Sequence, residues 1–136
     1  IVERHARTLA RILACPGVGL AILRHGDGAI AFARGRRVDP ADPDTVPRGA
    51  SPEAVAAAMD DFAHSREAGD VLVYGAWEDG GALSLSWEWS SHGGPSPQET
   101  ETFLIPPAGI PFDPTRIRHA SDLHHVFRAL YGAAEG

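Results

Sequence analysis

Apolar residues recur at helical spacing in three segments of the chain, residues 2–14, 51–69 and 121–132. Ser51 followed by Pro52 is typical of a helix start, because serine caps free N–H groups and proline lacks one. Ser121 offers the same cap to the last segment. The apolar stripes are formed by Leu9, Ile12 and Leu13, by Val55, Ala58, Met59 and Phe62, and by Leu123, Val126, Phe127, Leu130 and Tyr131.

Two apolar runs, residues 18–23 and 29–33, flank the turn-forming sequence "RHGDG" and predict a hairpin. The four consecutive apolar residues of "DVLVYG", 70–75, suit a strand that is covered on both faces. A helix followed directly by such a strand is typical of α/β proteins.

Residues 82–89 alternate apolar and polar side chains and predict a strand that forms a second hairpin with residues 70–75. A further short strand is expected at 102–106. The proline-rich segment 35–52 is interpreted as an irregular surface loop. Together these elements predict an α/β domain of about three helices and a mixed sheet of about five strands, spanning residues 1–136.

The composition suits a packed globular domain, with 136 residues of which 43% are hydrophobic and 22% charged. The apolar runs are too short to cross a bilayer, so we expect a soluble segment with no membrane contact. A net charge of −6 argues against nucleic acid as a partner, since Arg34, Arg36 and Arg37 form only a short local cluster.

The chain has no lysine and is rich in alanine, glycine, proline and arginine, which is typical of a GC-rich bacterial genome. A bacterial protein is therefore expected, and we expect this soluble segment of it to be cytoplasmic. The one cysteine, Cys15, excludes an internal disulfide and stands among apolar residues, so we predict a buried thiol.

Most histidines and acidic clusters have a simple interpretation. His124 and His125 fall off the apolar stripe of their helix and point about 100° apart, which disfavours joint metal binding. Asp60 and Asp61 diverge in the same way. The loop acids between residues 39 and 44 are expected to be solvated, so no convergent carboxylate pair is predicted.

His92 differs, because it follows a strand and is flanked by Ser91 and by Gly93 and Gly94, which remove side-chain bulk. Such a histidine could offer a ring nitrogen to a metal or a phosphate. The same residues equally suit a plain turn histidine, and both interpretations stay open on these grounds.

The segments "PGVGLAIL", "GDVLVYG", "SSHGG" and "QETETFLIPPAG" in succession resemble the C-terminal part of the alkaline phosphatase superfamily. The likeness is greatest to the alkaline-phosphatase-like domains of bacterial phage-holin-type membrane proteins. The resemblance implies a piece of an α/β/α sandwich and hydrolysis of phosphate esters, including diesters, assisted by two divalent metals, zinc or manganese. It assigns His92 as a metal ligand, with Ser91, Gly93 and Gly94 near the substrate.

The chain departs from the family pattern, because it contains no Asp-His dipeptide, and its one Asp-Thr pair, at residues 44–45, lies in the proline-rich loop. One histidine is not a metal site, since a catalytic zinc needs about three protein ligands. No catalytic residue is therefore assigned within this chain.

Two hypotheses fit this departure. The first, favoured by the isoleucine at position 1, is the metal-binding C-terminal segment of a larger hydrolase, whose partners are a phosphate ester and its own upstream segment. The parent protein would then be attached to a membrane. The second is a non-catalytic α/β module that binds a protein or a small ligand; a homo-oligomer is compatible with either.

Overall fold

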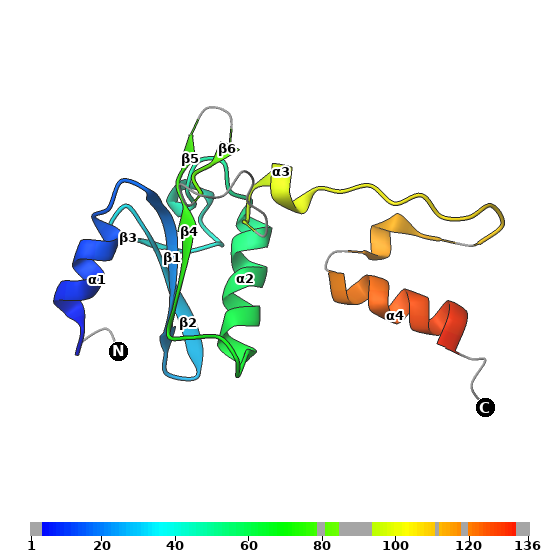
Figure 1. Cartoon of the computed structure of the whole chain (residues 1–136), viewed down its shortest axis with the longest axis horizontal. Helices are drawn as coiled ribbons and strands as arrows, with labels where there is room; N and C mark the ends of the chain where they lie inside the picture. Colours follow the sequence, from blue (N-terminus) through cyan, green and yellow to red (C-terminus); the bar gives the residue numbers. More distant parts are fainter. Residues whose placement is uncertain (1–3, 79–80, 85–93, 111, 118–119, 133–136) are drawn as a thin grey trace. The chain divides into compact units, whose positions relative to one another are not determined.

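The computed structural model describes residues 4–78, 81–84, 94–110, 112–117 and 120–132 (Figure 1). The chain divides into two compact units, Ile1–Thr102 and Phe103–Gly136. The first unit holds a four-stranded sheet with helices α1 (Ala6–Leu13) and α2 (Pro52–His64), so the chain has the small α/β fold that the sequence predicts.

The sheet has the strand order β3-β2-β1-β4, and its central strand β1 spans Val18–His25. β1 pairs antiparallel with β2 (Gly28–Ala33) on one side and with β4 (Val71–Gly75) on the other. Five consecutive residues of β1, from Gly19 to Leu23, are buried. The predicted hairpin of residues 18–33 is thus confirmed, and every pairing within the described sheet is antiparallel.

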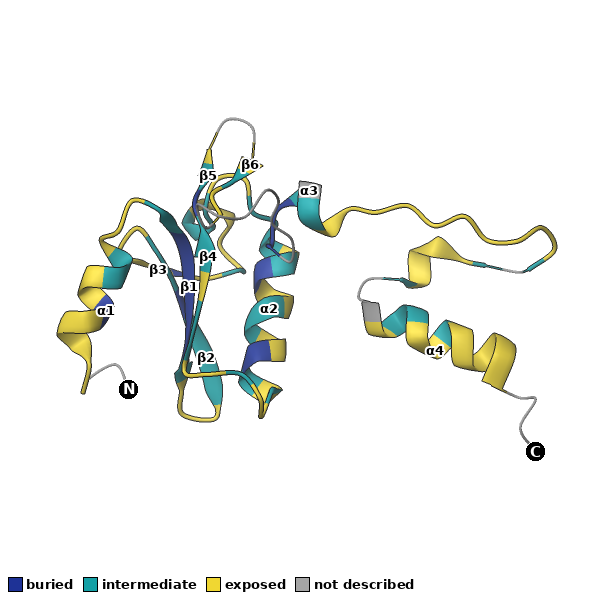
Figure 2. Ribbon diagram, in the orientation of Figure 1, coloured by how far each residue is buried: buried dark blue, intermediate teal, exposed yellow. Residues whose placement is uncertain are grey.

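Side chains alternate between two cores on the two faces of the sheet. One core joins Leu20 and Ile22 of β1 to Val55 and Phe62 of α2, whereas Ala21 and Leu23 face Leu9 of α1 on the other side (Figure 2). The two helices therefore cover opposite faces of the sheet (Figure 1).

Helix α2 begins as predicted. The Ser51 hydroxyl accepts a hydrogen bond of 3.2 Å from the backbone N–H of Ala54, and Pro52 occupies the first helical turn. The carboxylate of Glu53 accepts a second bond, of 2.8 Å, from the same hydroxyl, which lowers the pKa of Glu53 below its ordinary value.

Residues 71–75 form a strand, β4, as predicted, but the prediction that both faces of this strand are covered is wrong. β4 is the edge strand of the four-stranded sheet, and Val73 is 44% exposed. Leu72 and Tyr74 pack against the core beneath α2 and Val71 packs against the core that contains Leu9, but Val73 leaves that second face covered only in part. An apolar run alone cannot distinguish a central strand from an edge strand, because that depends on which strands pair with it.

The segment interpreted as an irregular loop contains two elements, β3 (Arg36–Val38) and a 3₁₀ helix (Pro43–Thr45). Val38 is only 2% exposed and belongs to the α2-side core. The turn between β2 and β3 has positive φ at Arg34 (49°) and at Gly35 (76°), as type I′ hairpin turns require.

Two glycines allow the backbone to cross closely where β1 meets the segment after β4. The pairing of β1 with β4 shifts register between Val18 and Leu20, and a Cβ on Gly19 would lie 2.6 Å from the Ala76 Cα. A Cβ on Gly75 would collide with the backbone carbonyl of Leu83. Glycine is therefore required at both positions, because even one methyl group would collide with backbone.

The second hairpin is shifted from its predicted position. β6 (Gly81–Ala82) pairs antiparallel with β5 (Trp77–Glu78) and not with residues 70–75, whose strand β4 pairs with β1. Residues 85–89 of the expected strand lie outside the described residues. A short helix, α3 (Pro97–Thr100), follows.

The expected strand at 102–106 is wrong, because these residues have no regular structure and no strand pairs with them among the described residues. Phe103 and Ile105 are more than 80% exposed, at 84% and 83%. The second unit contains a 3₁₀ turn (Pro114–Arg116) and helix α4 (Ala120–Tyr131), which confirms the last predicted helix.

Two further observations bear on the sequence predictions. Cys15 lies just beyond α1 and is exposed, so the prediction of a buried thiol is wrong. No helix in the described part of the chain is both long enough and apolar enough to cross a membrane.

Candidate functional site

Three of the four predicted site residues, Ser91, His92 and Gly93, lie outside the described residues. Gly94 is described, and it is buried at the start of the segment that leads into α3. Its backbone N–H donates to the Glu99 carboxylate at 3.2 Å, and the Ser96 hydroxyl donates to the same carboxylate at 2.8 Å. A Cβ at position 94 would collide with that carboxylate, which explains the glycine by packing.

The segment that contains Gly94 is joined to the start of α2. The Pro95 carbonyl accepts a 2.9 Å hydrogen bond from the backbone N–H of Ser51, the residue that caps this helix. Ser96, next along the chain, is only 3% exposed. The residues that follow position 93 are therefore positioned by packing and by backbone hydrogen bonds.

Within the described residues, no group of three or more His, Cys, Asp or Glu side chains could hold a metal ion. His124 and His125 are both exposed, as their place off the apolar stripe predicts, and their rings meet edge to face with centroids 5.8 Å apart. Because His92 lies outside the described residues, its assignment as a ligand stays a prediction.

Tyr74 packs against the core beneath α2, and the pKa of its phenol differs from the ordinary value. Burial raises the pKa of Tyr74, and the negative charges of Asp61 and Glu99 raise it further. All three effects favour the neutral phenol. Tyr74 therefore behaves as an uncharged core residue, not as an activated base.

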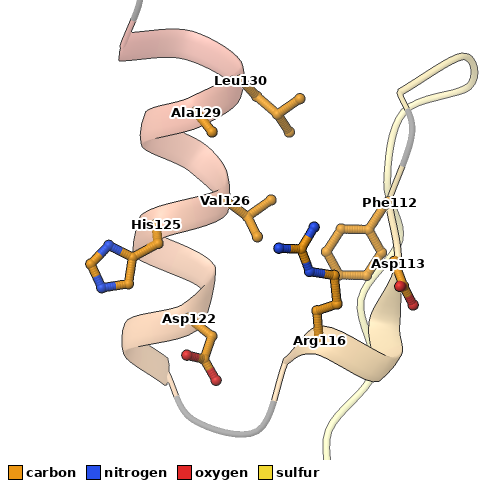
Figure 3. A pocket seen from close by; sticks show the side chains of 8 residues that line it. All are labelled: Phe112, Asp113, Arg116, Asp122, His125, Val126, Ala129 and Leu130. Atoms are coloured by element: carbon orange, nitrogen blue, oxygen red, sulfur yellow. The ribbon is translucent and has the colours of Figure 1, made fainter.

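The second unit contains an open groove of about 700 Å³ between α4 and the turn before it (Figure 3). Val126 and Leu130 extend from α4 toward Phe112 on the opposite wall (Figure 3). Asp113 accepts hydrogen bonds from the N–H and the hydroxyl of Thr115, at 3.0 and 2.6 Å, and these bonds lower the pKa of its carboxyl. These hydrogen bonds lie within the turn of Asp113 itself, so they give no evidence that the carboxylate binds a ligand.

A smaller pocket of about 150 Å³ lies in the first unit and gathers three arginines, Arg34, Arg36 and Arg48. We call it the arginine pocket. It is formed where the β2–β3 turn, the 3₁₀ loop, the start of β1 and β5 meet. Its wall is completed by Gly19, Ala33, Asp44, Thr45, Pro47, Ala76 and Trp77.

The three arginines carry no ion pair within the described part of the chain. The ion pair found there joins His64 to Asp60 on α2, far along the sequence from the pocket residues. Asp44 lines the same pocket, but it does not approach any of the three guanidinium groups to ion-pair distance. The wall thus has two positive charges in excess, in a protein whose net charge is −6.

Trp77 forms part of the wall of the arginine pocket. Its side chain packs closely against two glycines, since a Cβ on Gly19 would lie 2.9 Å from one ring carbon and a Cβ on Gly49 would lie 3.1 Å from the Trp77 Cβ. The indole Nε1 is buried and has no hydrogen-bond partner among the described residues. A buried donor without a partner is unusual in a folded protein and is satisfied when a bound group or water supplies an acceptor.

Thr45 fixes the loop that carries Arg48. Its hydroxyl oxygen lies 2.8 Å from the carbonyls of Asp39 and Asp42, which share its one proton, and it accepts a hydrogen bond of the same length from the N–H of Asp39. The segment expected to be irregular is therefore held in a defined shape. Because the hydroxyl already has these partners, Thr45 positions the pocket and is not free to act on a ligand.

Sequence reasoning did not find the arginine pocket. Arg34 and Arg36 were recognised as part of a charged cluster together with Arg37, but strand alternation places Arg37 outside the pocket. Arg48 and Trp77 come from segments that no pattern connects to that cluster. The available signal was the Arg34-Gly35 pair. Type I′ turns favour asparagine or glycine at their first central position, so an arginine there is unusual.

Comparisons of the chain with models of protein families, with curated proteins and with solved structures gave no match.

Proposed function

We propose that the first unit of this chain is a binding module for a small anion and that the arginine pocket is its binding site. The observation that carries this proposal is that three arginines line one pocket and that none of them forms an ion pair with a carboxylate among the described residues. It corresponds to the second of the two hypotheses drawn from the sequence, a non-catalytic module that binds a small ligand.

The charge distribution supports an anionic ligand. Three like charges that share one pocket repel one another, and a bound anion offsets this repulsion. With 18 acidic residues against 12 arginines, the chain has ample carboxylates to neutralise these side chains, yet none is placed to do so among the described residues. A local positive site on an acidic protein also attracts anions preferentially to that site.

The donor chemistry supports binding rather than catalysis. Each guanidinium offers several N–H donors in a planar fork that suits phosphate and carboxylate oxygens. The residues that line the pocket include no histidine, cysteine or serine, and the Thr45 hydroxyl is already bonded to backbone. No lining side chain is therefore arranged as a nucleophile with an adjacent base.

A direct test is isothermal titration of the whole chain with inorganic phosphate and, separately, with acetate. We expect saturable binding of one anion per chain, weakened roughly tenfold or more by Arg36→Gln or Arg48→Gln, as for loss of a charged hydrogen bond. Arg37→Gln is the matched control, since it removes the same charge from the same strand at a residue that does not line the pocket.

Either of two results would contradict the proposal. The first is that neither anion binds, and the second is that Arg37→Gln weakens binding as much as Arg36→Gln does. The second result would mean that only the overall charge of the protein matters.

The hydrolase hypothesis keeps its own test, because it depends on His92. Elemental analysis for zinc and manganese, together with hydrolysis of a nitrophenyl phosphate diester, should be compared between the wild-type chain, a chain extended upstream and a His92→Ala variant. If the extended chain neither binds metal nor cleaves the diester, that hypothesis is wrong.

A further inference from the structure

We propose that the arginine pocket selects a compact dianion of the phosphate monoester type and that Arg34 is the residue that sets this selectivity. The inference rests on the proposed function, since it names the class of anion bound at the same site. Three separate features of the pocket support it.

The first feature is the charge of the wall. Three guanidinium groups and the Asp44 carboxylate leave two positive charges in excess, so a ligand with two negative charges neutralises the pocket. A singly charged anion would leave one positive charge uncompensated. At the distances of direct contact, each further ligand charge is therefore expected to strengthen binding.

The second feature is the backbone of Arg34. Its φ of 49° lies in the left-handed region, where a long side chain is strained and where asparagine or glycine would be relaxed. Residues held in such conformations cluster at functional sites, because the surrounding fold must offset the strain. Arg34 lines the pocket, and asparagine or glycine at this position would be unstrained but would not bring a positive charge to it.

The third feature is size. A pocket of about 150 Å³ is large enough to hold a phosphate group. The three arginines come from two segments, the β2–β3 hairpin (Arg34 in its turn and Arg36 at the start of β3) and the loop after the 3₁₀ helix, and they line the pocket together. A tetrahedral group with oxygens in several directions matches this arrangement better than one planar carboxylate.

The experiment compares three probes on the whole chain by isothermal titration: methyl phosphate, methyl sulfate and malonate. Methyl phosphate and methyl sulfate have the same shape, but only the phosphate carries a second negative charge at neutral pH. We expect methyl phosphate to bind at least roughly tenfold more tightly than methyl sulfate. Malonate, a dianion of different shape, is expected to bind more weakly than methyl phosphate.

The pH dependence gives an independent check. A phosphate monoester takes up a proton at about pH 6, so methyl phosphate should lose its advantage over methyl sulfate as the pH falls through this value. The charged groups of the pocket wall are Arg34, Arg36, Arg48 and Asp44, and no histidine lines it. Methyl sulfate meets the same groups and therefore reports any titration of the protein itself.

The variant Arg34→Asn tests the role assigned to Arg34, and a thermal melt shows that the variant is folded. We expect the preference for methyl phosphate over methyl sulfate to fall to about twofold or less, because one positive charge is lost. Arg37→Gln should retain the wild-type preference.

The outcomes separate this inference from the proposed function. Equal binding of methyl phosphate and methyl sulfate, tighter binding of malonate, or an unchanged preference in Arg34→Asn overturns the inference but leaves an anion site in place. If none of the three probes binds, the inference and the proposed function both fail.

Discussion

The guanidinium carbon of Arg24 lies 5.1 Å from the centroid of the Phe62 ring, which joins the end of β1 to the last turns of α2. The same guanidinium donates to the carbonyl of Ala63 at 3.1 Å and to those of Ala68 and Gly69 at 3.3 Å each, and also to the Ser65 carbonyl. These carbonyls lie at and after the C-terminus of α2, where backbone acceptors have no helical partner. Arg24 therefore closes α2 against the sheet.

We expect Arg24→Ala to lower the free energy of unfolding by about 3 kcal/mol, because several charged hydrogen bonds and the ring contact are lost together. Arg24→Lys should recover only part of this loss, since an ammonium group cannot reproduce the planar fork. Urea unfolding measures both. The exposed Arg66, mutated to alanine, is the control, and an equal loss there would show that Arg24 contributes only its charge.

Gly75→Ala is expected to lower the free energy of unfolding by about 2 kcal/mol or more, because the new methyl group would collide with the Leu83 carbonyl and backbone cannot yield as a side chain can. Gly69→Ala adds the same methyl group where no atom lies within 4 Å and should be tolerated. Chemical denaturation of the two variants provides the comparison. Equal stability of both would mean that the backbone contact between Gly75 and Leu83 is looser than described.

Tyr74 should make the fold sensitive to high pH. Burial, with smaller effects of Asp61 and Glu99, raises the pKa of the phenol in the folded state above its ordinary value of 10.0. Stability from this source is fully present below that value and is lost as the pH rises through the folded pKa. Denaturant titrations above pH 10 should show this decline in the wild type and a shallower decline in Tyr74→Phe.

Tyr131 provides the control for this prediction, because its side chain on α4 is 59% exposed. Tyr131→Phe should preserve the alkaline decline of the wild type. If Tyr74→Phe and Tyr131→Phe decline alike, the alkaline effect has another origin.

Arg34→Asn should raise the free energy of unfolding by about 1 kcal/mol, since asparagine adopts the left-handed conformation more readily than arginine. Arg36→Asn removes the same charge from an ordinary strand position and should give no such gain. Thermal melts of the two variants, without added anion, test this prediction. A loss of stability in Arg34→Asn would show that the arginine is favoured by packing.

The sequence predicts elements best where a local pattern also specifies the tertiary environment. The run from Leu20 to Leu23 is apolar on both faces, and β1 is indeed the central strand between two helices. Ser51 and Pro52 define the start of α2 through local backbone geometry. In each case, residues close in the chain supply all the information.

The same patterns fail where an element depends on a partner. The apolar run 102–106 has the composition of a strand, but no described strand pairs with it. β3 was missed because its sequence is charged, although Val38 is buried in the core. A strand forms only where it pairs with a neighbouring strand, and the composition of one segment does not specify that neighbour.

By itself, the sequence determined the α/β class, the central hairpin and the helical stripes, because these follow from periodicity and caps within short segments. Only the tertiary structure decided that β4 lies at an edge and that Arg34, Arg36 and Arg48 share one pocket with Trp77. The physical reason is that a binding site depends on distances between segments remote in the chain, which packing of the sheet and its loops sets.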